Sequence, residues 1–145
     1  MQLKVKYLFP NMPELITRSG DSGYDLRAAI KEPITIEPKS HTTVGTGIAV
    51  EVATEMNIDL ELQVRPRSGH TVKGIVAQFG TIDASYRGEI SITLFNFSNK
   101  AITIEPNERI AQLVVCPIFK PEIITTKTLT KTERGARGFG STGKD

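Results

Sequence analysis

The sequence contains only one cysteine, Cys116, and two histidines, His41 and His70, among 145 residues. A single cysteine excludes an internal disulfide and fits a reducing compartment, so we expect a cytoplasmic protein. Because Cys116 follows the apolar run 113–115, we expect a small buried side chain there. These residues are too few for a structural zinc site, and a histidine-centred catalytic triad is not indicated. For His70, just after Arg67-Ser68-Gly69, we expect a solvated loop position.

An excess of charge of one sign is also missing, because 18 lysines and arginines face 16 acidic residues, which leaves a net charge of +2. This balance argues against binding to nucleic acid by general phosphate neutralisation, so no nucleic-acid partner is expected. The chain has no long apolar run, and residues 1–6 alternate. We therefore expect neither a signal peptide nor a membrane partner. The length is typical of one domain, which buries roughly 70% of its unfolded surface.

What the sequence does contain is a period of two residues. Leu3–Tyr7, Leu60–Arg65 and Glu89–Leu94 each alternate apolar and polar side chains, which predicts strands with one buried face. A long apolar period of 3.6 residues is missing, and at most a short helical turn is expected near Thr54–Asn57. Many short strands separated by turn residues predict an all-β sandwich, jelly roll or small barrel. Further predicted strands are Ile34–Ile36, Thr42–Val52, Ile75–Phe79, Ile102–Ile104 and Ile110–Ile118.

One pentapeptide, Ile-Thr-Ile-Glu-Pro, occurs at 34–38 and again at 102–106. The flanking residues do not repeat, so we interpret it as a strand ended by a proline turn and used twice. From Lys120 the composition changes, first to threonine and lysine and then, over 134–143, to glycine. We therefore expect residues 1–120 to form the core and residues 121–145 a flexible, glycine-rich C-terminal arm.

Two stretches offer groups for binding an anion or a cation. In Gly23–Ala29, Asp25 is either an inward carboxylate at the start of a strand or a structural residue. In Arg65–Gly69, Arg67 presents planar donors for a phosphate or carboxylate, Ser68 adds a hydroxyl, and Gly69 lets the backbone come close.

Gly80–Gly88 lies between two predicted strands and is expected to be a hairpin turn. Its glycines permit close approach of a ligand to the backbone, and Asp83 and Tyr86 lie three positions apart. Taken alone, the stretch is equally an ordinary hairpin with a surface aspartate and a half-buried tyrosine. Downstream, Gln112 shares a strand face with apolar neighbours, where its amide either reaches a ligand or satisfies backbone groups.

The last stretch, 134–143, imitates a phosphate-binding loop. Residues 138–144 match a Walker A loop as far as the lysine, but Asp145 replaces the required Ser/Thr and no helix follows. We therefore reject a P-loop NTPase. Arg134 and the hydroxyls of the tail still suit phosphate contacts, and Phe139 suits stacking on a base.

Taken together, the five stretches resemble, in order and content, the five motifs of the trimeric dUTPases. The resemblance runs from Ser22 to Gly143 and is sharpest at Gly80–Glu89 and Arg134–Gly143. It implies a jelly-roll-like homotrimer with active sites between subunits, where the arm of one chain closes over a neighbour's site. It also implies that dUTP is hydrolysed to dUMP and pyrophosphate with Mg²⁺, which removes dUTP from the nucleotide pool and supplies dUMP for dTMP synthesis.

The resemblance also implies a role for each matching residue. Asp83 corresponds to the carboxylate that activates water for attack on the α-phosphorus; a carboxylate is a weak base, so it acts mainly by placement. Tyr86 corresponds to the tyrosine that leaves no room for a ribose 2′-hydroxyl, and Asp25 to the residue that holds magnesium through water. The implied substrate-binding residues, for base, sugar and phosphates, are Arg67, Ser68, Gly69, Gly80, Thr81, Ile82, Tyr86, Ser91, Gln112, Arg134, Phe139, Gly140, Ser141 and Thr142.

Two alternatives remain at this stage. A dCTP deaminase resembles this fold but needs a glutamate in the strand after the hairpin, where this chain has Thr93. A non-catalytic jelly-roll module that binds protein or sugar would not explain an aspartate, a tyrosine and two phosphate loops together.

Overall fold

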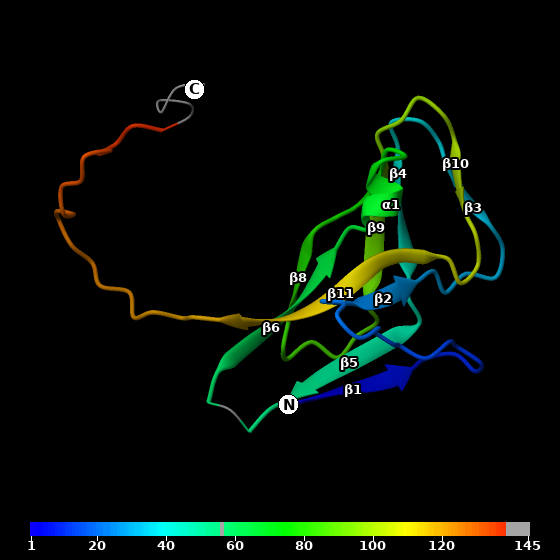
Figure 1. Ribbon diagram of the computed structural model, residues 1–145, viewed down its shortest axis with the longest axis horizontal. Coiled ribbons are helices and arrows are strands. Elements are labelled where there is room, and N and C mark those ends of the chain that lie inside the picture. The colour runs from blue at the N-terminus through cyan, green and yellow to red at the C-terminus, as the bar shows by residue number, and fades with distance from the viewer. Residues whose placement is uncertain (56, 139–145) are drawn as a thin grey trace.

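The alternating segments form strands in the computed structural model, which describes residues 1–55 and 57–138 (Figure 1). That described part is almost entirely β-structure, as predicted, with one short helix. In chain order the elements are β1 (Gln2–Tyr7), β2 (Tyr24–Arg27), β3 (Ile34–Ile36), β4 (His41–Gly45), β5 (Ile48–Ala53), β6 (Asp59–Arg65), α1 (Ser68–Thr71), β7 (Ile75–Ala77), β8 (Gly80–Asp83), β9 (Ser91–Asn96), β10 (Ile102–Ile104) and β11 (Arg109–Ile118).

Strand β11 lies inside the largest sheet, whose order is β2-β11-β6-β8. It pairs antiparallel on both sides, so that Leu113 lies opposite Tyr24 on β2 and Val64 on β6. A second sheet has the order β4-β9-β7, and two strand pairs, β1-β5 and β10-β3, complete the fold. Inward side chains from all four groups of strands form one apolar core, with Leu26, Leu94 and Leu113 fully buried. This jelly-roll-like all-β architecture confirms the predicted fold class.

The repeated pentapeptide forms a strand pair of its own. Residues 34–36 and 102–104 pair antiparallel as β3 and β10, with Thr35 opposite Thr103. Ile36 and Ile104 point into the core and are 1% exposed. These strands lie at the opposite end of the molecule from the arm (Figure 1).

Two predicted segments are arranged differently from the expectation. The run 42–52 divides into β4 and β5, because Gly47 takes a positive φ of 68° that turns the chain. Gly80–Asp83, expected to belong to a turn, forms strand β8 and pairs with the free edge of β6. The edge of β6 supplies backbone partners for it, and Ile82 packs against the core.

The helical turn expected near residues 54–57 does not form in the described part of that segment. The one described helix, α1, instead follows Arg67, and it makes the prediction of a solvated His70 wrong. His70 is 9% exposed, and its Nε2 lies 2.9 Å from Oε1 of Glu108. The turn of α1 directs the ring inward onto the β10–β11 connection, where the carboxylate of Glu108 pairs with it.

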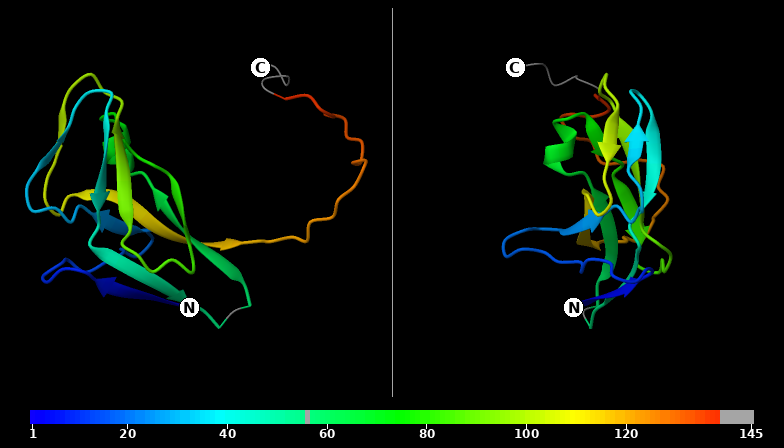
Figure 2. Two further views of the ribbon diagram at one scale, coloured as in Figure 1. Left: turned by 180° about the vertical axis from the view of Figure 1, so that it is seen from behind. Right: turned by 90° about the vertical axis from the view of Figure 1, so that its right-hand side faces the viewer.

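Beyond β11 the chain leaves the sheets as an extended segment (Figures 1 and 2). Its apolar side chains are almost fully exposed, at 92% for Phe119, 93% for Ile123 and 85% for Leu129. Cys116, predicted to be buried, is only partly so. It lies on the polar face of β11, with its sulfur 3.5 Å from Nη2 of Arg65. No helix within the described residues is long and apolar enough to cross a membrane.

The pair of His70 and Glu108 predicts a measurable contribution to stability. Replacing Glu108 by alanine leaves the buried imidazole without its carboxylate and the backbone N–H of Glu105 without its acceptor. We expect the free energy of unfolding to fall by about 1–3 kcal/mol in urea denaturation at a fixed protein concentration. Glu105→Ala, an exposed position on the same turn, is the matched control and should change it by less than about 0.5 kcal/mol. Equal effects of the two changes would contradict a stabilising role for the pair.

Candidate active site

One face of the sheet β2-β11-β6-β8 gathers polar side chains. Asp25 lies opposite Gln112, and Gln112 lies opposite Arg65, so their side chains share a face. Asp83 lies opposite Glu61 on β6. Because Glu61 is four residues before Arg65 on the same strand, both side chains point to the same face, and Asp83 shares it. Leu62, Val64 and Leu113 alternate with these residues and point into the core. The predicted residues Asp25, Thr81, Asp83 and Gln112 thus share one side of one sheet.

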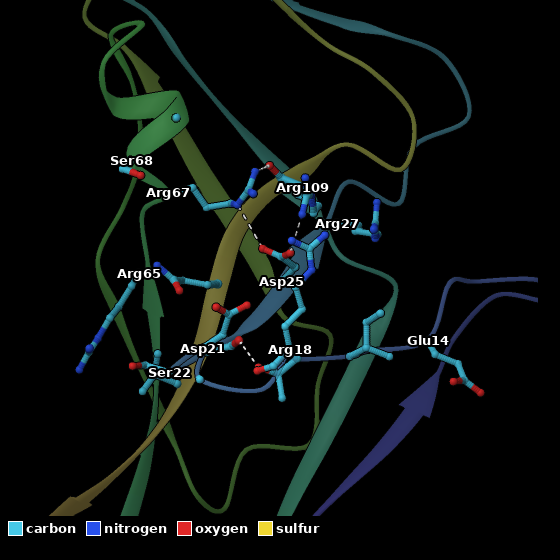
Figure 3. A pocket seen from close by; sticks show the side chains of 17 residues that line it. Glu14, Arg18, Asp21, Ser22, Asp25, Arg27, Arg65, Arg67, Ser68 and Arg109 are labelled. Atoms are coloured by element: carbon cyan, nitrogen blue, oxygen red, sulfur yellow. Dashed lines mark hydrogen bonds and ion pairs between the residues drawn. The ribbon is translucent and has the colours of Figure 1, made fainter.

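Asp25 is held between two arginines on this face (Figure 3). The Nε atom of Arg67 lies 3.1 Å from Oδ1 of Asp25, and Nη1 of Arg109 lies 3.1 Å from Oδ2. Nη1 of Arg67 also donates to the backbone carbonyl of Arg109, at 3.0 Å. The carboxylate therefore orients two guanidinium groups that come from different segments of the chain.

The phosphate loop predicted at Arg67–Gly69 is the start of α1. The amide of Gln112 donates to the carbonyl of Pro66 at 3.1 Å, which ties β11 to the start of this loop. Ser68 and Gly69 are exposed, and a Cβ placed on Gly69 would meet nothing within 4 Å. Open space over a backbone of this kind admits a ligand.

These residues line a pocket of about 660 Å³ between the loop 14–23, β2, β11 and the phosphate loop (Figure 3). Its arginines outnumber its carboxylates by five to three, so the pocket suits an anion. The sequence indicated a role for Arg67 but none for Arg109, which begins β11 three residues before Gln112. The charged residues of the pocket are Arg18, Arg27, Arg65, Arg67, Arg109, Glu14, Asp21 and Asp25.

The hairpin residues line a different pocket, of about 320 Å³, formed by Thr81, Ile82, Asp83, Tyr86, Glu89, Ile90 and Ser91. Asp83 is exposed, and its carbonyl accepts the N–H of Tyr86 at 2.9 Å, which closes a turn. The hydroxyl of Tyr86 donates to the carbonyl of Glu89 at 3.1 Å. A Cβ on Gly80 would meet nothing within 4 Å, so the backbone at the start of β8 is open to a ligand.

The tip of the hairpin is also tied to strand β5. Nη1 of Arg87 donates to the carbonyl of Ala84 at 2.6 Å, and its Nε lies 3.6 Å from Oε2 of Glu51. The hydrogen bond from Lys4, followed by the charges of Lys4 and Arg87, lowers the pKa of Glu51 from its ordinary value. The ionised carboxylate therefore holds a cation from β1 and a cation from the hairpin tip.

The two pockets lie well apart within one chain. Asp25 and Asp83 are separated by three strand spacings across the sheet and by four residues along β6, counted from Arg65 to Glu61. At strand spacings of about 4.8 Å and a rise of about 3.3 Å per residue, the Cα atoms of the two aspartates are roughly 20 Å apart. A triphosphate is shorter than this distance.

The arm contributes only Arg134 to the described part of the predicted site. Its Nε donates to the carbonyl of Arg137 at 3.0 Å, within a local turn of the arm. The other predicted arm residues lie outside the described part of the chain: Phe139, Gly140, Ser141 and Thr142.

The described residues contain no cluster of three or more His, Cys, Asp or Glu side chains that could hold a metal ion. Asp25 is 34% exposed at its side chain and faces the arginine pocket. A single, partly exposed carboxylate suits a hydrated cation that is held mainly by a bound phosphate chain.

Comparisons with known proteins show which family this chain resembles. A model of the dUTPase family matches residues 12–143. A deoxyuridine 5′-triphosphate nucleotidohydrolase of Nautilia profundicola is 43% identical over 99% of this chain and 100% of its own length. The dUTPase of Staphylococcus bacteriophage 80alpha, solved with dUpNHpp, superimposes with a TM-score of 0.83 at 30% identity and 98% coverage of both chains. A dUTPase variant from phage phi11 of S. aureus, described for its coordination of a structural Mg(II) ion, gives a TM-score of 0.77 at 25% identity, covering 90% of this chain and 100% of that one.

A family match over most of the chain, supported by a full-length relative and by the same fold, establishes that this protein belongs to the dUTPase family.

Proposed function

We propose that this protein hydrolyses dUTP to dUMP and pyrophosphate, by attack of a water molecule on the α-phosphorus. This activity would remove dUTP from the nucleotide pool and supply dUMP for dTMP synthesis, in the cytoplasm. The observation that carries the proposal is the division of one sheet face into an arginine pocket and a pocket that holds Asp83 beside Tyr86. The family membership and the relatives' activity agree with it.

The arginine pocket supplies the phosphate grip. Arg67 presents its guanidinium, and Ser68 and Gly69 present a hydroxyl and open backbone at the pocket wall. Gln112 holds the start of this loop through Pro66 and lines the same pocket. An incoming triphosphate would compete with Asp25 for Arg67 and Arg109, whose guanidinium groups are already oriented for it.

Magnesium fits this pocket as a companion of the substrate. When bound, the ion would neutralise charge on the phosphates and fix their conformation. Asp25 would hold it through water, because both carboxylate oxygens contact arginines and each keeps a further lone pair. The described residues offer no cluster of carboxylates and imidazoles that would bind the ion alone.

The hairpin pocket supplies base recognition, sugar selection and the water-activating carboxylate. Asp83 is exposed at the pocket edge, where it would orient a water molecule and accept its proton as the attack proceeds. The half-exposed ring of Tyr86 would lie under the deoxyribose and leave no room for a 2′-hydroxyl. The open backbone at Gly80, with Thr81, Ile82 and Ser91, would read the edge of uracil.

The active site would be shared between chains of a homotrimer. The distance between Asp25 and Asp83 in one chain supports this arrangement, because the arginine pocket of one subunit needs the Asp83 of another. Residues 1–120 would form the catalytic core, and residues 121–145 the arm that covers a neighbour's site. The exposed apolar side chains of the arm, such as Ile123 and Leu129, support docking onto a neighbour. The arm residues Arg134, Phe139, Gly140, Ser141 and Thr142 would then contact the phosphates and stack on the base.

Deamination of dCTP is not favoured. On β9, the hydroxyl of Thr93 lies 3.0 Å from that of Thr43 and offers no acid or base at the position where deamination needs a glutamate. The comparisons give a dUTPase family match and no support for a purely binding module.

The first prediction concerns Asp83. Asp83→Asn should reduce pyrophosphate release from dUTP by at least about a thousandfold while nucleotide binding persists, because the amide cannot accept a proton from water. In the same assay, the wild type should cleave dUTP in strong preference to dTTP, dCTP and UTP, and only with magnesium present.

The Asp83 prediction has a matched control. Glu61→Gln, on the neighbouring strand, is the matched control and should retain most activity. Near-normal turnover by Asp83→Asn would refute the assignment.

The second prediction concerns sharing of the site. Asp83→Asn and Arg67→Ala chains should each be inactive alone, and unfolding and refolding them together in equal amounts should restore about a quarter of wild-type activity. Recovery arises because a mixed trimer can join an intact arginine pocket to an intact Asp83 from another chain. Mixing without unfolding, so that trimers do not exchange chains, is the control. If the refolded mixture stays inactive although mixed trimers form, the site lies within one chain.

A further inference from the structure

Glu89 lines the hairpin pocket beside Tyr86, yet neither base reading nor water activation gives it a task. We propose that Glu89 is a specificity-positioning residue, whose carboxylate fixes Tyr86 in the orientation that excludes a ribose 2′-hydroxyl. The proposal rests on the proposed function, since it refines how the same pocket selects deoxyribose.

The carboxylate of Glu89 is bound to a segment that is distant in sequence. Its Oε1 accepts the backbone N–H of Gly47 at 2.8 Å, in the turn between β4 and β5. Gly47 is buried and Glu89 is partly buried, so this charged hydrogen bond is shielded from solvent. The bond therefore fixes the start of β9 against the β4–β5 turn.

The same residue holds the tyrosine. The hydroxyl of Tyr86 donates to the backbone carbonyl of Glu89 at 3.1 Å. Tyr86 is 48% exposed, so packing alone does not fix the orientation of its ring. A hydroxyl bonded to a carbonyl that is itself fixed defines the position of the ring edge toward the sugar.

The β4–β5 turn is a rigid partner for Glu89. Thr46 is 2% exposed, and its hydroxyl and its backbone N–H both donate to the carbonyl of Ile90, at 2.6 and 3.0 Å. The N–H of Ile90 donates in turn to the carbonyl of Ile48 at 2.9 Å. The residue that follows Glu89 is therefore fixed to the core, and the carboxylate bond extends this rigidity toward Tyr86.

Two glycines make room for this arrangement. A Cβ on Gly45 would lie 2.5 Å from Oε1 and 3.0 Å from Cδ of Glu89, so the carboxylate occupies the space that a side chain there would fill. A Cβ on Gly88 would collide with the hydroxyl of Tyr86. The missing side chains at these two glycines thus leave the space that both groups occupy.

Loss of the carboxylate should change selectivity more than turnover of dUTP. A ring that is free to shift would admit the 2′-hydroxyl of UTP and raise kcat/KM for UTP. Because dUTP lacks this hydroxyl, its kcat/KM should not rise. A purely structural role for Glu89 would instead lower kcat/KM for both nucleotides by the same factor.

The test compares kcat/KM for dUTP and UTP in wild type, Glu89→Ala and Glu89→Gln. We expect the dUTP-to-UTP ratio to fall about tenfold in Glu89→Ala, the size of one charged hydrogen bond. Glu89→Gln keeps an oxygen for the N–H of Gly47 and should retain most of the ratio. Glu37→Ala, an exposed glutamate after β3, is the control and should match the wild type. An unchanged ratio in Glu89→Ala would overturn the proposal.

A second variant keeps the test decisive if Glu89→Ala folds poorly. Gly45→Ala removes no functional group from the chain, but its added Cβ forces the carboxylate of Glu89 to move. It should lower the dUTP-to-UTP ratio in the wild-type background and also in the Glu89→Gln background, where an amide of the same size is displaced. In the Glu89→Ala background, which has no long side chain to displace, it should have no further effect, the sign of coupling between the two positions. An unchanged ratio in Gly45→Ala, or an equal effect in the Glu89→Ala background, would contradict the proposal.

Different results would refute the proposed dUTP hydrolysis and the proposed role of Glu89. If the wild type cleaves neither dUTP nor UTP, the proposed function is wrong. If it cleaves dUTP selectively and every Glu89 and Gly45 variant keeps the wild-type ratio, only the role of Glu89 is wrong.

Discussion

The pairing of β11 with both of its neighbours is the constraint on which the rest of the structure depends. Its backbone places Gln112 between Asp25 on β2 and Arg65 on β6. Since Arg109 begins the same strand and Arg67 follows the end of β6, both guanidinium groups reach the Asp25 carboxylate. The arginine pocket is therefore a consequence of strand register, because a slip of β11 by one residue would turn Gln112 into the core.

The strands were predictable because alternation records which face is buried, as in 60–65, and because Ile-Thr-Ile marks both β3 and β10. The errors arose where tertiary contacts decide. Gly80–Asp83 reads as a turn by composition, but the free edge of β6 makes it a strand. His70 reads as a loop residue because its partner Glu108 lies 38 residues away, a separation that no local pattern reveals. Cys116 follows an apolar run but falls on the polar side of β11.

Motifs predicted a set of candidate site residues, but they could not predict the geometry of those residues. Arg67, Asp25 and Gln112 meet because three strands are in register, and this could be inferred only after the sheet order was known. The separation of Asp83 from that group could not be inferred from spacing along the chain, since Arg67 and Asp83 are close in sequence. Strand β8 folds back along β6 and carries Asp83 toward the opposite end of that strand, away from the arginines.

The glycines of the hairpin region show how one residue type serves opposite purposes. Gly80 and Gly69 face open space, so the missing side chain leaves backbone accessible to a ligand. At Gly88 and Gly45 the space is filled from within, by Tyr86 and Glu89. Composition treats all four as turn residues, whereas the structure divides them into positions where the backbone is open and positions where Tyr86 or Glu89 fills the space. In the proposed function, selectivity would therefore depend on internal packing that lies one layer behind the pocket surface.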